Sequence, residues 1–105
     1  MKQILEIYDT VRDLGYCRSQ ADFSVNWLSR SPSHLAYLKS ANAMPSLTTV
    51  RLLINKLKTE LDILSIQRST VTYRRLNSAY ISARVIHDAL NEMKFVPRAY
   101  WMTAM

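Results

Sequence analysis

Apolar side chains recur at helical spacing in five stretches of the chain. The first covers residues 3–14 and is followed by Gly15, a residue suited to the left-handed conformation that ends many helices. The second begins at Ser19, a suitable N-cap, with Asp22 near the positive end of the helix dipole. The apolar face of this second helix, which we expect in the core, consists of Phe23, Trp27 and Leu28.

Two prolines divide the middle of the chain. Ser31 is a natural N-cap and Pro32 suits the first position of a helix, where a missing N–H costs nothing. These residues predict a third helix that runs to about Ser40, with Leu35 and Leu38 pointing inward. Pro45 and Ser46 interrupt the helical pattern, and a fourth helix that begins with them reaches residue 64.

A fifth helix is predicted around residues 72–94 by apolar positions that alternate in steps of three and four. This seam consists of Leu76, Ala79, Ala83, Ile86, Leu90 and Met93. It spans less than three heptads, so it should pack on its own domain or in a homodimer rather than form a free-standing coiled coil. The tail at 95–105 is aromatic-rich and broken by Pro97, and the pattern does not place it.

The composition favours an all-α fold. The chain has 105 residues with 49% hydrophobic and 21% charged side chains, which is typical of a globular protein with a core. One Gly and three Pro are too few for many short strands joined by tight turns. We therefore predict a four-helix, helix-turn-helix core over residues 1–64. A longer C-terminal helical extension over residues 65–105 packs on this core or mediates dimerisation.

The net charge of +6 suits a polyanionic partner, because neutralising phosphates releases counterions. The excess of basic residues lies in the middle and C-terminal parts of the chain. No apolar run approaches the length that spans a bilayer, and the N-terminus is amphipathic and contains acidic residues, unlike a signal sequence. We expect a cytoplasmic protein without a membrane partner.

The residues that support catalysis or metal binding are scarce. His34 and His87 lie on different predicted helices, and no Gly-rich phosphate loop or nucleophile motif is present. His87 with Asp88 and Glu92 could form part of a metal site, but a second His at useful spacing is missing. The sequence therefore predicts no enzyme, no metal and no cofactor.

The order of these features resembles the phage-repressor family, the lambda repressor and Cro-like (XRE-type) helix-turn-helix proteins, over roughly residues 19–64. The second helix of that family opens with Ser-Gln and carries apolar residues further along, matched here by Ser19, Gln20, Phe23 and Leu28. Its recognition helix is matched by Ser31, Leu35 and Leu38, and the start of its next helix by Pro45, Ser46 and Leu47. The Gly often found in the family's tight turn is replaced by Ser29 or Arg30.

This resemblance implies a transcriptional regulator that binds double-stranded DNA, with the third helix in the major groove. Carried over by position, the implied DNA-contacting residues are Gln20, Arg30, Ser33, His34, Tyr37, Lys39 and Asn42. A homodimer is expected because one short recognition helix reads only a few base pairs. The helix around residues 72–94 is predicted to make or support the dimer contact through the seam of Leu76, Ala79, Ala83, Ile86, Leu90 and Met93, and the competing interpretation is that this seam covers the core. The alternative hypothesis is an adaptor or inhibitor that binds another protein through its aromatic and Met-rich C-terminal surface.

Overall fold

The chain folds into helices throughout the part that the structure describes, which confirms the all-α prediction. The structure is a computed structural model that describes the backbone of residues 2–67 and 70–104 and the side chains of residues 2–66 and 70–92. Within these residues the elements are α1 (Lys2–Asp13), α2 (Gln20–Asn26), α3 (His34–Ala41), α4 (Leu47–Ile63), the 3₁₀ turn η1 (Ser65–Gln67) and α5 (Val71–Ala104).

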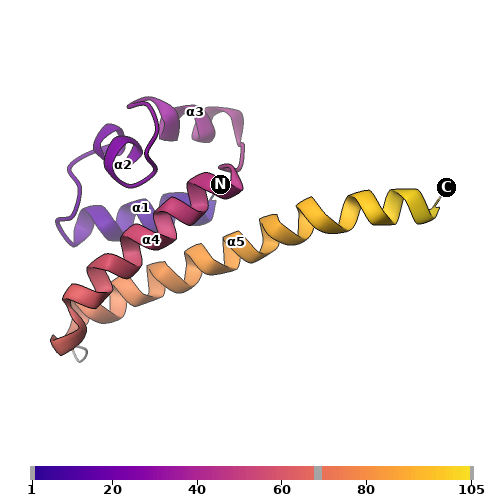
Figure 1. The fold of residues 1–105 in the computed structure, drawn as a ribbon. Coiled ribbons are helices and arrows are strands. Elements are labelled where there is room, and N and C mark those ends of the chain that lie inside the picture. Colours follow the sequence, from indigo (N-terminus) through magenta and orange to yellow (C-terminus); the bar gives the residue numbers. More distant parts are fainter. Residues whose placement is uncertain (1, 68–69, 105) are drawn as a thin grey trace.

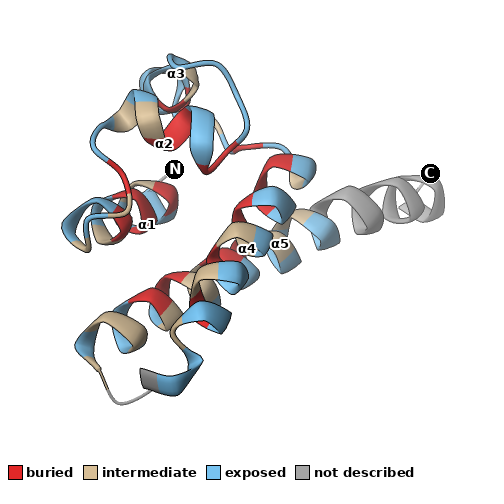
Figure 2. Ribbon diagram, turned by 60° about the vertical axis from the view of Figure 1, so that its left-hand side comes forward, coloured by how far each residue is buried: buried red, intermediate tan, exposed pale blue. Residues whose placement is uncertain are grey.

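Helices α1, α4 and α5 form the body of the molecule, and α2 and α3 form a second pair on one side of it, beside α1 and the start of α4 (Figure 1). Helix α5 packs against both α4 and α1. All five helices contribute side chains to the buried interior, and Figure 2 shows these residues in red along α1, α2 and α4. Phe23, Trp27 and Leu28 are buried, as predicted.

The expected ends of α1 and α2 are present. Gly15 has a φ of +86°, and the N–H of Tyr16 reaches back to the carbonyl of Val11 at 3.0 Å, the bonding of a Schellman motif. Ser19 caps α2 because its hydroxyl accepts the backbone N–H of Asp22 at 3.2 Å. These two termini depend only on local residue chemistry, and the sequence predicted them correctly.

The start of α3 differs from the prediction that Ser31 is its N-cap. The N–H of His34 donates to the carbonyl of Ser31 at 3.0 Å, and Ser33 has φ −91° and ψ 2°. These values fit a type I turn with Pro32 at its second position, and α3 begins only at His34. Proline has the same φ at the first position of a helix and at the second position of this turn, so the sequence pattern did not separate the two.

Helix α3 ends at Asn42, which adopts the left-handed conformation with a φ of +48°. The N–H of Ala43 donates to the carbonyl of Leu38 at 2.9 Å, so Asn42 takes the place that Gly15 has at the end of α1. A second left-handed residue, Ser29 with a φ of +55°, turns the chain after α2. Ser29 therefore adopts, without being Gly, a conformation that Gly most readily takes.

The sequence allowed the α5 seam to pack either within its own chain or in a homodimer. In the structure the seam packs within the chain. Leu76, Ala79, Ala83 and Ile86 are buried in the common core, and Leu90 is partly buried against it. The side chain of Met93 lies outside the described residues. Helix α5 continues through Pro97, although we expected a break there, since a proline inside a helix removes one backbone hydrogen bond without forcing the chain out of the helix.

The buried hydroxyl of Ser24 joins α2 to α3. Its Oγ donates to the carbonyl of Gln20 at 2.9 Å and accepts the N–H of Leu35 at 3.0 Å. The carbonyl of Ser24 also accepts the N–H of Arg30 at 2.9 Å. The first turn of α3 is thus capped by a side chain of α2, whereas Ser33 makes no side-chain capping bond.

We expect Ser24→Ala to lower the free energy of unfolding by about 1–3 kcal/mol, because it leaves the N–H of Leu35 buried without a partner. The matched controls Ser31→Ala and Ser33→Ala, both at exposed positions, should change it by less than about 0.5 kcal/mol. Urea unfolding followed by circular dichroism measures all three. If Ser31→Ala lowered the free energy of unfolding as much as Ser24→Ala does, the cap of α3 would come from the residues just before the helix rather than from α2.

Candidate nucleic-acid interface

The outer face of α3 carries exposed polar and aromatic side chains. Ser33 lies in the turn before the helix, and Tyr37, 56% exposed, follows one turn later on the same face. Lys39 is also exposed, but it lies two residues after Tyr37 and therefore on another side of the helix. Leu35 and Leu38 are buried on the opposite side and fix the rotation of the helix. Figure 2 shows α3 largely in the colour of exposed residues, so this face is open to a partner.

His34 occupies the first turn of α3 in a half-buried position. Its ring centroid lies 6.4 Å from that of Tyr37. The Nε2 atom is buried and makes no hydrogen bond to any residue that the structure describes. Burial, reinforced by the nearby positive charge of Arg30, lowers the pKa of His34 below its usual value. The imidazole is therefore mainly neutral at pH 7 and adds no full positive charge to the first turn of α3.

Arg30 bridges the turn to the start of α4. Its Nε donates to Thr49 Oγ1 at 2.9 Å, and its Nη2 donates to Ser46 Oγ at 3.1 Å. Ser46 also caps α4 by accepting the N–H of Thr49 at 3.2 Å. Arg30, which the sequence analysis assigned to DNA, thus positions the turn relative to α4. A guanidinium has five N–H donors, so these two bonds leave others available to a phosphate.

The structure gives Gln20 and Asn42 local structural roles. Gln20 opens α2 in a half-buried position, and its carbonyl accepts the hydroxyl of Ser24. Asn42 is exposed and ends α3 through its left-handed backbone. Neither role requires DNA. Six of the seven predicted positions lie in α3 or in the turns that flank it, and Gln20 lies at the start of α2. The side chains of five of them are exposed, namely Arg30, Ser33, Tyr37, Lys39 and Asn42.

The segment that includes α3 and α4 is positively charged along most of its length. Residues 23–59 contain no Asp or Glu and five basic residues, which are Arg30, Lys39, Arg51, Lys56 and Lys58. Two of them have neighbours within the protein: Lys56 Nζ lies 5.4 Å from the centroid of the Trp27 ring, and Arg51 Nε donates to His87 Nε2 at 3.2 Å. Arg30 and Lys39 lie in the turn before α3 and in α3, whereas the other three basic residues lie along α4.

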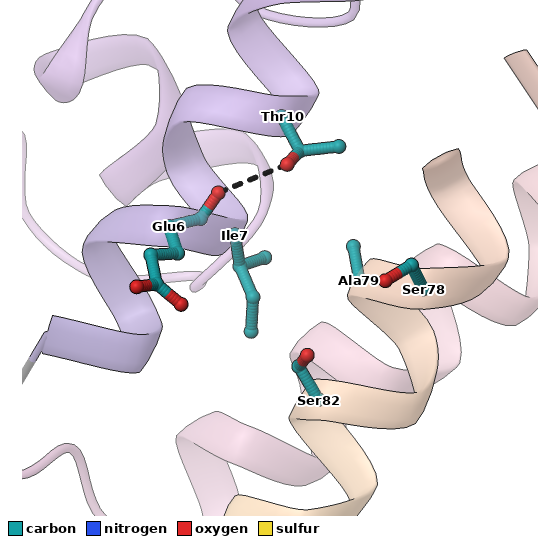
Figure 3. Close-up of a pocket in the computed structure, with 6 residues that line it drawn as sticks. All are labelled: Glu6, Ile7, Thr10, Ser78, Ala79 and Ser82. Atoms are coloured by element: carbon teal, nitrogen blue, oxygen red, sulfur yellow. Dashed lines mark hydrogen bonds between the residues drawn. The ribbon is translucent and has the colours of Figure 1, made fainter. Parts of the chain in front are cut away.

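A shallow groove of about 120 Å³ lies on another side of the molecule, between α1 and α5. Figure 3 shows Glu6, Ile7 and Thr10 on α1 opposite Ser78, Ala79 and Ser82 on α5. Thr10 donates its hydroxyl to the carbonyl of Glu6 at 3.0 Å, so that hydroxyl is engaged within its own helix. The lining includes no His or Cys that could pair with a hydroxyl as a base or nucleophile.

The structure also bears on metal sites and on membrane-spanning helices. Among the described residues, no three His, Cys, Asp or Glu side chains come together as a possible metal site. No described helix is long and apolar enough to cross a membrane. The side chains of residues 95–105, on which the adaptor hypothesis depends, lie outside the described part, and that hypothesis stays a prediction.

Sequence reasoning missed two positioning residues, Ser24 and Thr49. It placed Ser46 at the start of the fourth helix, where it is the N-cap, but did not predict its bond to Arg30. Ser24 and Thr49 are buried polar residues on helix faces that are otherwise apolar. Such a residue at a core position signals an internal hydrogen bond, because an unpaired hydroxyl there is costly. The sequence therefore held a signal for Ser24 and Thr49, but their partners are 11 and 19 residues away and were not predictable.

The lowered pKa of His34 predicts that stability decreases on acidification. The unfolded chain binds a proton near pH 6.5, while the folded chain resists it, so the stability present above about pH 6.5 is lost as the pH falls through the folded pKa. His34→Gln should flatten the decline in the free energy of unfolding between about pH 7.5 and about pH 5. His87→Gln is the matched control, and a flattened decline in that variant alone would contradict the assignment.

Comparison with known proteins identifies the family but not an activity. No significant match to a curated protein or to a solved structure was found. Residues 4–101 match the family described as Family of unknown function (DUF6626). Because this match covers almost the whole sequence, the chain belongs to the DUF6626 family, whose function is unknown.

Proposed function

We propose that this protein binds duplex DNA through α2, the following turn and α3, and that it regulates transcription. The observation that carries the proposal is a short helix held at a fixed angle with an open, acid-free outer face. Ser24 holds the first turn of α3 against α2, and Leu35 and Leu38 hold its inner side in the core. A helix presented in this way can enter a major groove as a rigid unit.

The side chains on this face fit two kinds of DNA contact. Ser33 can donate or accept a hydrogen bond at a base edge or a phosphate, and Tyr37 offers a hydroxyl on a large exposed ring. Lys39 and the remaining donors of Arg30 are suited to phosphates that flank the groove. The absence of Asp and Glu from residues 23–59 means that no carboxylate of this segment would face the phosphates.

The first test separates base contacts from phosphate contacts. Selection from a random duplex library should enrich a sequence bound by the wild-type chain. The double variant Ser33→Ala with Tyr37→Ala should keep weak, salt-dependent binding but lose the preference, because each interaction with a base edge contributes about 1–3 kcal/mol. Fluorescence anisotropy with the selected and a scrambled duplex measures the difference. An unchanged preference, or no binding of the wild type to any duplex, would refute the proposal.

A second test concerns the phosphate contact of Lys39. Lys39→Ala should weaken binding to selected and scrambled duplexes alike and reduce the slope of log K against log salt by about 1. Lys58→Ala removes the same charge from an exposed position in the C-terminal half of α4 and is the matched control. If Lys58→Ala changed the slope as much as Lys39→Ala, the attraction would come from net charge rather than from α3.

A further inference from the structure

Helix α5 carries a second heptad stripe on the side opposite its buried seam. The positions again alternate in steps of four and three, and every one of them is exposed. They are Arg74, Ser78, Ile81, Val85, Asp88 and Glu92. The buried seam packs inside the chain, whereas every residue of this outer stripe is exposed at the surface, where a second chain can reach it.

The exposed apolar side chains of α5 gather on this stripe. Ile81 is 54% exposed and Val85 is 63% exposed, and they lie one turn apart at its centre. Val71, 67% exposed, continues the same stripe towards the start of the helix. In the described part of α5 no other large hydrophobic side chain is exposed. Exposed apolar residues that share one helical stripe, instead of being scattered, indicate a contact surface.

The charges at the two ends of the stripe are opposite in sign. Arg74 lies at the N-terminal end, and Asp88 and Glu92 lie at the C-terminal end. Two parallel copies would bring Arg74 beside Arg74 and Glu92 beside Glu92, which is repulsive. Two antiparallel copies would bring each Arg74 beside a Glu92. The stripe is therefore complementary to itself in only one of the two orientations.

We propose that the protein forms a homodimer in which the outer stripe of α5 pairs antiparallel with the same stripe of a second copy. The two-fold axis crosses the outer stripe of α5 at the level of residue 83, midway between residues 81 and 85. It therefore places Ile81 against Val85 of the second copy. The same register places Ser78 opposite Asp88 of the second copy, where a hydroxyl can donate to a carboxylate. It also places Arg74 opposite Glu92 of the second copy. Each contact occurs twice, as a closed two-fold interface requires.

This contact needs no rearrangement of the core. The side chain of Asp88 is 69% exposed, and the neighbouring Nδ1 of His87 lies 3.3 Å from its Oδ1, which leaves room for a further donor.

The proposed interface is small. The span from Arg74 to Glu92 is about 27 Å of helix, and it carries only two large apolar layers. Such a contact lies at the small end of protein interfaces, so we expect dissociation constants in the micromolar range.

The proposal does not depend on DNA binding, and sedimentation of the free protein tests it. The wild-type chain should be a dimer at tens of micromolar. Ile81→Glu with Val85→Glu places like charges opposite one another at both central contacts, so it should remain helical and raise the dissociation constant at least about 30-fold. Ile63→Glu, at a site 68% exposed on α4, is the matched control and should still dimerise. A wild-type monomer at hundreds of micromolar would overturn the proposal.

Cysteine cross-linking tests the orientation. In the antiparallel register Ser78→Cys should not cross-link to itself, because the two copies of residue 78 are about 15 Å apart along the helices. A mixture of Ser78→Cys and Asp88→Cys chains should form a mixed disulfide. Cys17 does not compete, because it is buried and its burial raises the pKa of its thiol. Self-cross-linking of Ser78→Cys would show a parallel dimer and would overturn the proposal.

Charge exchange provides an independent readout of the same register. Arg74→Glu and Glu92→Arg should each weaken the dimer several-fold, since each places like charges opposite one another. The double variant carries both changes and restores opposite charges across the antiparallel pair. It should therefore regain dimerisation close to that of the wild type. Two single variants that weaken the dimer without recovery in the double variant would contradict the register.

Discussion

The hydroxyl of Ser24 is the interaction on which the placement of α3 depends. A helix of eight residues is too short to be stable alone, so its position must come from contacts made elsewhere. Ser24 supplies these contacts from the neighbouring helix, with one bond to its own helix and one to the first turn of α3. The bond lies in a buried site, where water cannot replace it, and it therefore fixes the angle between the two helices.

Arg30 extends this polar network to the main body of the molecule. Its backbone N–H is bound to Ser24, and its guanidinium is bound to Ser46 and Thr49 at the start of α4. The turn between α2 and α3 is thus hydrogen-bonded both to α2 and to the start of α4. It contains no glycine, although Ser29 adopts a left-handed conformation there. A turn fastened by several side-chain bonds can tolerate one strained residue, because its neighbours determine its backbone.

Helix α5 has two faces with different consequences. Its buried seam completes the core formed with α1 and α4, which makes the helix part of the same folded body rather than a detached extension. Its outer stripe has the same periodicity but is exposed in the single chain. Periodicity alone assigns neither face to the core, and both faces carry the spacing that helix pairs use.

The sequence by itself determined the helical class, the cores of the five helices and the termini that depend on local chemistry. Gly15 and Ser19 act on backbone groups within a few residues, so their roles follow from residue type and spacing. The candidate site was predictable only as a cluster of positions around α3. The exposure of Ser33 and Tyr37 followed from helical period, whereas the anchored state of Arg30 and the buried Nε2 of His34 did not.

Only the tertiary structure decided where α3 begins, what caps it and which side of α5 joins the core. Pro32 fits a helix start and a type I turn equally well, and the bond from Ser24 across 11 residues favours the turn. The seam of α5 could equally have joined a second chain, and the positions of α1 and α4 decided that it packs within its own chain. Such choices depend on groups distant in sequence that fold to the same place, and local spacing carries no information about them.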